Sequence, residues 1–194
     1  GDITLTHKPD TGLLLKNTNT ADGNPAVLTL QTGETAVETG DNLGQITFQA
    51  PDEASGTDAI IDGAKIAAVA EADFAADANA TSLRFLTGAS GAASSKMAIT
   101  SDGNIGVGTN SPSFTYGGGI EIERADSATL RLQRTGSTAS ALELSADDGQ
   151  TRLDTRTSVP MLFSTGSTER ARITGTTGHL CIGRTGTSSG AEEE

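Results

Sequence analysis

The chain has 194 residues, 25 acidic and 13 basic, which gives it a formal net charge of −12. This acidity argues against a nucleic-acid partner, because phosphate binding draws on clustered Lys and Arg, and no stretch approaches the ~20 apolar residues that a membrane helix needs. Leu, Ile, Val and Phe make up about a fifth of the chain, so that a lone monomer would have a thin core.

Short runs of alternating apolar and polar residues begin at residue 27. VLTLQT, residues 27–32, places its two leucines on one face, and GQITFQA, residues 44–50, does the same with Ile46 and Phe48. A period of two is the pattern of half-buried β-strands. We therefore predict a strand in each run.

The Ala-rich stretch 59–78, AIIDGAKIAAVAEADFAADA, allows two interpretations. Its alanines favour a helix by intrinsic propensity. Gly63 interrupts the run, however, and AKIAAVAEADF fits equally well a strand whose inward face must be small, as where three chains crowd one axis. We expect the strand and keep a short helix as the alternative.

Further alternating runs follow from residue 82 onward, with Leu130 and Leu132 facing in and Arg131 and Gln133 facing out. The predicted strands are SLRFLTG (82–88), IEIER (120–124), TLRLQR (129–134), ALELSA (141–146) and MLFSTG (161–166). Segments such as SDGN and ADDGQ between them combine Asp, Asn or Ser with Gly, as tight turns do. The chain is therefore predicted to be all-β.

One phrase occurs twice, as MAITSDGNIGVGTNSP at 97–112 and as ARITGTTGHLCIGRTGT at 171–187. Similar strands precede both copies, since LRFLTG at 83–88 matches MLFSTG. We predict that each phrase is the closing hairpin of a module, with glycines at its turn. The predicted modules are 1–112, with the Ala-rich insert, and a shorter 113–194, joined through a Pro-, Ser- and Gly-rich linker region at 111–119.

The sequence contains few residues that suggest a metal or catalytic site. His7 and His179 stand far apart in the sequence, and Cys181 has no further ligands near it that would complete a zinc set,. All three are expected to be structural.

Two motif matches are weak. GTSSG at 186–190 fits the nucleophile-elbow pattern around Ser188, but that motif needs a strand before it and a helix after it, and only AEEE follows. GNIGVG at 103–108 has no P-loop Lys after it and no βαβ unit around it. We expect a strand with glycines at crowded positions.

Two acidic pairs, Asp52 with Glu53 and Asp147 with Asp148, could serve as glycosidase carboxylates or Ca²⁺ ligands. Neighbouring strand residues point to opposite faces, however, and solvated turn acids are the preferred interpretation, with a fortuitous Ca²⁺ site between chains kept open. Aromatic residues make up only 3%, with Tyr116 the single tyrosine, which disfavours a strong sugar-binding surface. No catalytic, cofactor-binding or metal-binding residue is predicted, and we do not expect an enzyme.

The phrases SKMAITSDGNIGVGTNSP and STERARITGTTGHLCIG resemble a repeat of bacteriophage tail-fibre and virion appendage proteins, of the type ERMRITSDGNVGIGTTSP. The stretch 21–74 also looks like fibre modules of phages that infect marine bacteria. The second phrase departs from the pattern, since GTTGH at 175–179 is one residue longer than SDGN and His179 and Cys181 replace Asn and Gly. In this family a self-cleaving chaperone domain often follows; without it, this chain would be a matured product, a shaft fragment or a fibre that trimerises unaided.

The resemblance implies elongated tandem β-sandwich or jelly-roll-like modules intertwined in a homotrimer. It also implies a structural virion fibre, a tail fibre or its shaft, that supports host attachment alongside other virion proteins. The alternatives are a capsid decoration protein or cell-surface adhesin that binds a host glycan and, less favoured, a polysaccharide depolymerase. No cofactor, nucleic acid or membrane insertion is expected.

Overall fold

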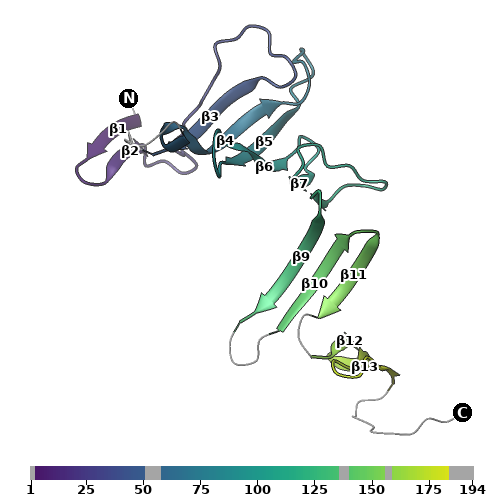
Figure 1. Ribbon diagram of the computed structural model, residues 1–194. Helices are drawn as coiled ribbons and strands as arrows, with labels where there is room; N and C mark the ends of the chain where they lie inside the picture. Colours follow the sequence, from purple (N-terminus) through teal and green to yellow (C-terminus); the bar gives the residue numbers. More distant parts are fainter. Residues whose placement is uncertain (1–2, 51–57, 136–139, 156–158, 184–194) are drawn as a thin grey trace, which may run out of the picture. The chain divides into compact units, whose positions relative to one another are not determined.

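The computed structural model describes residues 3–50, 58–135, 140–155 and 159–183. Its chain contacts divide it into two compact units, Gly1–Gly103 and Asn104–Glu194. Across the described residues, β-strands and one short 3-10 turn form the regular structure (Figure 1). The all-β prediction is confirmed. The module boundary at 112/113 and the linker region at 111–119 stay predictions.

The first unit contains a hairpin and a larger antiparallel sheet. Strands β1 (Ile3–Lys8) and β2 (Gly12–Asn17) pair with each other, with Leu5 opposite Leu15. The sheet then runs β3 (Asn42–Gln49), β4 (Asp62–Ala70), β5 (Thr81–Thr87) and β6 (Ser94–Ile99). Each of these strands pairs antiparallel with the next, and the 3-10 turn Asp58–Ile60 precedes β4.

The Ala-rich stretch forms the central strand β4 over residues 62–70, so its helix alternative is wrong. The buried Ala67 and Ala98 lie opposite Arg84 in the register, one on each neighbouring strand. The Nε of Arg84 donates a hydrogen bond of 3.0 Å to Oγ of the buried Ser82. Small neighbours therefore leave room on this face for a long side chain of the same copy.

The strand predicted at 27–32 is not formed. Residues 24–34 run without strand, turn or bend assignment, and Val27, Leu28 and Leu30 stay 65, 69 and 45% exposed. The alternation is real, but a strand also needs a neighbouring strand to accept its backbone hydrogen bonds. Among the residues that the structure describes, this stretch has no such neighbour.

The second unit contains three groups of short strands. β7 (Ile105–Val107) and β8 (Ile120–Ile122) pair in parallel. Strands β9 (Ser127–Arg134), β10 (Ser140–Asp147) and β11 (Gln150–Thr155) form one antiparallel sheet, and β12 (Met161–Thr165), β13 (Thr168–Ile173) and β14 (Leu180–Ile182) form another. The predicted hairpin at ADDGQ is confirmed, because β10 ends at Asp147 and β11 begins at Gln150.

Both copies of the repeated phrase are a strand, a glycine turn and a second strand. In the first copy the Gly103 amide donates to the Thr100 carbonyl at 2.9 Å, and in the second the Gly178 amide donates to the Thr174 carbonyl at 3.0 Å. Both glycines have positive φ, at 80° and 71°. In the second copy β13 and β14 pair antiparallel, which confirms the closing hairpin there.

Candidate functional surfaces

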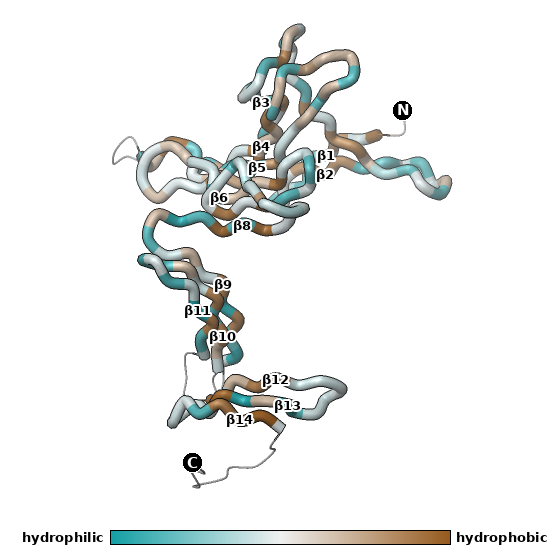
Figure 2. Tube along the Cα trace, turned by 90° about the vertical axis from the view of Figure 1, so that its right-hand side faces the viewer, coloured by the Kyte–Doolittle hydropathy of each residue, from teal (hydrophilic) through white to brown (hydrophobic). Residues whose placement is uncertain are grey.

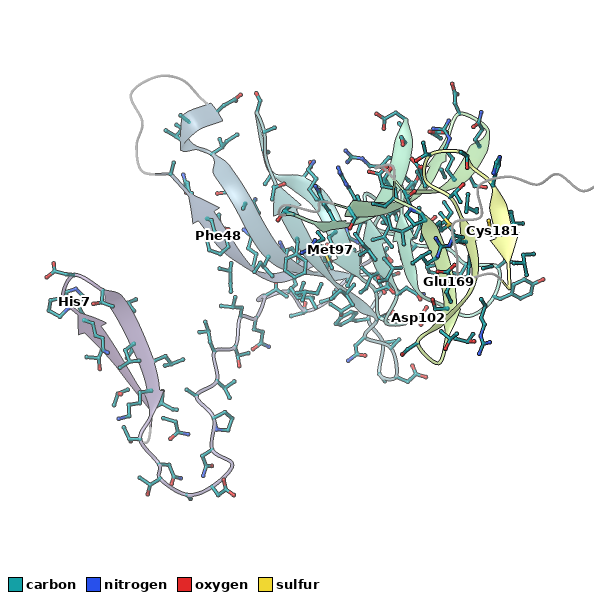
Figure 3. The ribbon with its side chains drawn as sticks, turned by 90° about the horizontal axis from the view of Figure 1, so that it is seen from below. His7, Phe48, Met97, Asp102, Glu169 and Cys181 are labelled. Atoms are coloured by element: carbon teal, nitrogen blue, oxygen red, sulfur yellow. The ribbon has the colours of Figure 1, made fainter. Side chains whose placement is uncertain are left out.

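The most distinctive surface of the first unit is one apolar face of the β3–β6 sheet. Side chains opposite one another in a ladder point to the same face, and one row consists of Ile46, Ile66, Phe85 and Met97. Figure 3 labels Met97 of this row and Phe48 of the adjacent row. Ile46 and Phe48 remain 47 and 55% exposed, so the chain leaves this face partly open.

The β9–β11 sheet has a similar face in the second unit. Leu130, Leu144 and Leu153 stand opposite one another in a single row, and all three keep 48 or 49% of their surface exposed. On the opposite face, Nε of Arg131 lies 3.3 Å from a Glu143 carboxylate oxygen on the neighbouring strand. The predicted division into apolar and polar faces is confirmed.

A cleft of about 440 Å³ continues this apolar face toward β8. Ile120 and Ile122 line it together with Leu130 and Leu144, and Arg152 is the charged residue of its lining. With so many aliphatic walls and so few charges, the cleft suits an aliphatic side chain better than a polar ligand.

The β12–β14 sheet repeats the arrangement. Met161, Ile173 and Leu180 form one row, and Phe163 and Ile182 stand in the next. Ile182 is 73% exposed, and Figure 2 shows the hydrophobic residues along β9–β11 and at β14 in brown. Three sheets of different sequence therefore each have an apolar face that is partly exposed.

Large side chains are absent from the buried core of the described residues. The buried apolar side chains there are Ala67, Val69, Ala70, Ala98 and Ala141, and Leu, Ile, Phe and Met are all at least partly exposed. Alanines contribute little burial energy, whereas burying a Leu, Ile or Phe fully contributes about 1.5–3 kcal/mol. Many of the large apolar side chains of the described residues are therefore still accessible to a partner.

The described residues that were considered for chemistry lie on different elements. His7 lies near the turn of the β1–β2 hairpin (Figure 3), and Cys181 lies on β14 opposite Arg172. In the described part of the chain no group of three or more His, Cys, Asp or Glu side chains could hold a metal ion. Asp147 lies 3.4 Å from the Arg152 guanidinium across the β10–β11 turn, but its other carboxylate oxygen is buried without a hydrogen-bond partner in the described chain, so this turn acid is not solvated as predicted.

Two of the sequence candidates lie outside the described residues. These are the pair Asp52 and Glu53 and the GTSSG stretch around Ser188. GNIGVG is confirmed as a strand with crowded glycines, because a Cβ at Gly106 would collide with the Thr109 carbonyl. Tyr116 is 91% exposed in the segment between β7 and β8. None of the helices in the described residues is long and apolar enough to cross a membrane.

The β1–β2 hairpin was missed by the sequence analysis. Ile3 and Leu5 on β1 share a face with Leu13 and Leu15 on β2, and Leu5 and Leu13 are 68 and 73% exposed. The same period of two would have predicted β1 from ITLTHK. The three consecutive leucines of β2 obscure that alternation.

Two carboxylates accept hydrogen bonds that lower their pKa. Oδ1 of Asp73 accepts bonds from the Thr39 amide at 2.8 Å and the Thr39 hydroxyl at 3.0 Å, which lower the pKa of Asp73. Glu169 accepts two bonds from the Arg172 guanidinium, at 2.5 and 2.7 Å, and this pairing lowers the pKa of Glu169. Both pairs favour the ionised acid.

The Asp73 contact predicts a stability change at acid pH. Because the folded state lowers the pKa of Asp73, the contact stabilises fully above the ordinary Asp pKa, and the gain is lost as pH falls through the lowered value. Asp73→Asn should therefore lower the melting temperature at neutral pH and flatten its fall between about pH 5 and pH 2. Calorimetry across this range is the measurement, with Asp77→Asn in the same segment as the control. Equal pH profiles for Asp73→Asn and the parent would contradict the assignment.

Comparison with known proteins adds two solved structures of low similarity. The carboxy-terminal domain of the bacteriophage T5 L-shaped tail fibre has 13% identity and a TM-score of 0.44, over 90% of this chain and 92% of that one. The same domain with its intra-molecular chaperone domain has 12% identity and a TM-score of 0.44, and this chain spans 62% of its length. No protein-family model matches, and no curated protein matches.

Proposed function

We propose that the chain is a structural protein of a bacteriophage virion, a homotrimeric tail fibre or fibre shaft that extends from the particle and supports host attachment. The single observation that carries this proposal is the open apolar face on each sheet, such as the half-exposed row Leu130, Leu144 and Leu153. A cyclic trimer brings three identical faces together around one axis. The sandwich-like packing of the modules would then form between copies.

The repeated phrases support a fibre in particular. Together with the stretch 21–74, their resemblance to phage fibre proteins covers most of residues 20–187, and stacked modules that bury their open faces on neighbours build length. The proposed role is mechanical and adhesive, with other virion proteins as partners. Three copies of any weak contact to a host-surface glycan would raise avidity without a tight individual site.

The mass of the assembled chain tests the proposal. Mass photometry at nanomolar concentration should give roughly 59 kDa, the mass of three chains of 19.6 kDa in a closed trimer,. A stable 19.6 kDa species at that concentration would overturn it. Labelling of intact particles with an antibody against this chain should then mark an appendage. On a glycan array, a shaft should give no hits, whereas an adhesin should give several.

A further inference from the structure

We propose that residues 26–33, AVLTLQTG, form a β-strand that pairs with the free edge of β3 in a second copy of the chain. This inference rests on the oligomer proposed above and adds which strand crosses between copies. Both halves of the contact, the unpaired strand and the unpaired edge, belong to this chain. A second copy is therefore the occupant that fits.

The first observation is a stretch of backbone without partners. Within the part of the chain that the structure describes, no hydrogen bond joins an amide or carbonyl of residues 26–33 to another protein group. A segment whose leucines alternate but whose backbone bonds only to water is not stabilised as a strand, because its amides and carbonyls have no neighbouring strand to pair with. Leu28 and Leu30 on one face and Thr29 and Gln31 on the other fit a strand that is half buried,.

The second observation is an unpaired edge strand that carries neither a charge nor a proline. β3 pairs with β4 on one side, and no strand of the first unit pairs with its other side among the described residues. Natural edge strands usually carry a charge or a proline that discourages pairing with another chain. β3, NLGQITFQ, has neither along its eight residues, although its register against β4 shifts near both ends, between Asn42 and Gly44 and between Phe48 and Gln49, which leaves Gly44–Phe48 as the regular part of the edge. It matches the length of the eight-residue segment 26–33.

The two halves are also complementary in their side chains. If Leu28 and Leu30 lie on the same face as Ile46 and Phe48, they extend the open apolar face of the β3–β6 sheet by one strand. The polar residues Thr29 and Gln31 then fall on the face of Gln45, Thr47 and Gln49. A shift by one residue would reverse both matches, so the pattern also specifies the face.

The connection explains why the segment does not pair with β3 of its own chain. The Gly40 amide donates to the Ala70 carbonyl and the Phe74 amide to the Val37 carbonyl, both at 2.9 Å. With the Thr39–Asp73 bonds, these contacts hold residues 37–41 against the end of β4. Leu30 lies over Gly44, where a Cβ would come within 2.8 Å of the Leu30 Cβ, and a cleft of about 620 Å³ opens between residues 29–32 and 42–45. The segment thus crosses the sheet face instead of joining its edge.

Proline substitutions test the pairing. Amides along a strand point alternately to its two edges. Thr29→Pro and Thr32→Pro, made as separate variants, remove amides on opposite edges, so at least one of the two variants should disrupt the ladder. That variant should need about tenfold or more higher protein concentration to stay assembled. Thr35→Pro, just beyond the segment, is the matched control and should assemble as the parent does. Hydrogen exchange of residues 26–33 should be slow in the assembled parent.

Cysteine pairing then distinguishes a second copy from the same chain. In a Cys181→Ser background, a chain with Thr29→Cys is refolded together with a chain that carries Gln45→Cys, Thr47→Cys or Gln49→Cys. A disulfide-linked pair of chains is expected in at least one mixture. If the disulfide forms only within one chain that carries both cysteine substitutions, the segment pairs with its own β3 and the inference is overturned.

The size of the parent keeps this inference separate from the proposed function. A parent that is a monomer refutes both. Two results together refute the strand pairing alone: the parent is a trimer with fast hydrogen exchange at residues 26–33, and both proline variants assemble as Thr35→Pro does.

Discussion

Leu132→Asp is expected to abolish assembly of the chain at concentrations at which the parent is fully assembled. Leu132 is 62% exposed on the apolar face of β9–β11, so in an isolated copy the change would be harmless. In the proposed trimer the leucine would be buried, and its loss together with the burial of a carboxylate would cost at least about 2 kcal/mol per copy. Three copies give roughly 6 kcal/mol, or about 10⁴-fold in the dissociation constant of the trimer. Analytical ultracentrifugation over a concentration series is the measurement.

Gln133→Asp is the matched control for this prediction. Gln133 is the next residue on β9, is exposed, and lies on the opposite face, across from Ala141. The same charge there should leave the trimer intact, and circular dichroism should show similar strand content in both variants. Assembly of Leu132→Asp at the parent's concentration would mean that this face is not the interface.

Gly108→Ala is expected to destabilise the second unit by about 3–5 kcal/mol. Gly108 has a φ of +88°, and a Cβ there would collide with the Glu123 carbonyl. The left-handed conformation alone costs a non-glycine residue roughly 1–2 kcal/mol. The collision adds to it, because the Glu123 amide donates to the Val107 carbonyl at 2.8 Å and the two segments cannot separate without losing that bond. Thermal unfolding should shift by roughly 10 °C or more.

Gly103→Ala separates conformational strain from collision. Gly103 also has positive φ, at +80°, but a Cβ there would meet nothing within 4 Å. Only the strain of about 1–2 kcal/mol is then expected. Equal losses for the two variants would show that the contact at Glu123 relaxes without cost.

The alternation of single residues was enough to predict most strands and their faces. Leu130 and Leu132 point to one face and Arg131 to the other, and the Arg131–Glu143 pair forms across the strands as this division requires. The ADDGQ and SDGN turns could be predicted because their glycines adopt positive φ, which depends on the residue itself and its nearest neighbours,. The scarcity of large apolar residues predicted the thin core for the same reason, since it is a property of composition.

Pairing could not be predicted in the same way. VLTLQT has the pattern of a strand and forms none in the single chain, because contacts of residues 37–41 with the end of β4 lead it away from the nearest edge. AKIAAVA could have become a helix, and it is a strand because β3 and β5 supply backbone partners on both sides. The sequence by itself thus determined the class of structure, the turns and the two-faced character of the strands. Which strands pair, and which apolar faces stay exposed, was decided only by the tertiary structure. The backbone hydrogen-bond partners of a strand, and the side chains that pack on its apolar face, come from residues distant in the chain.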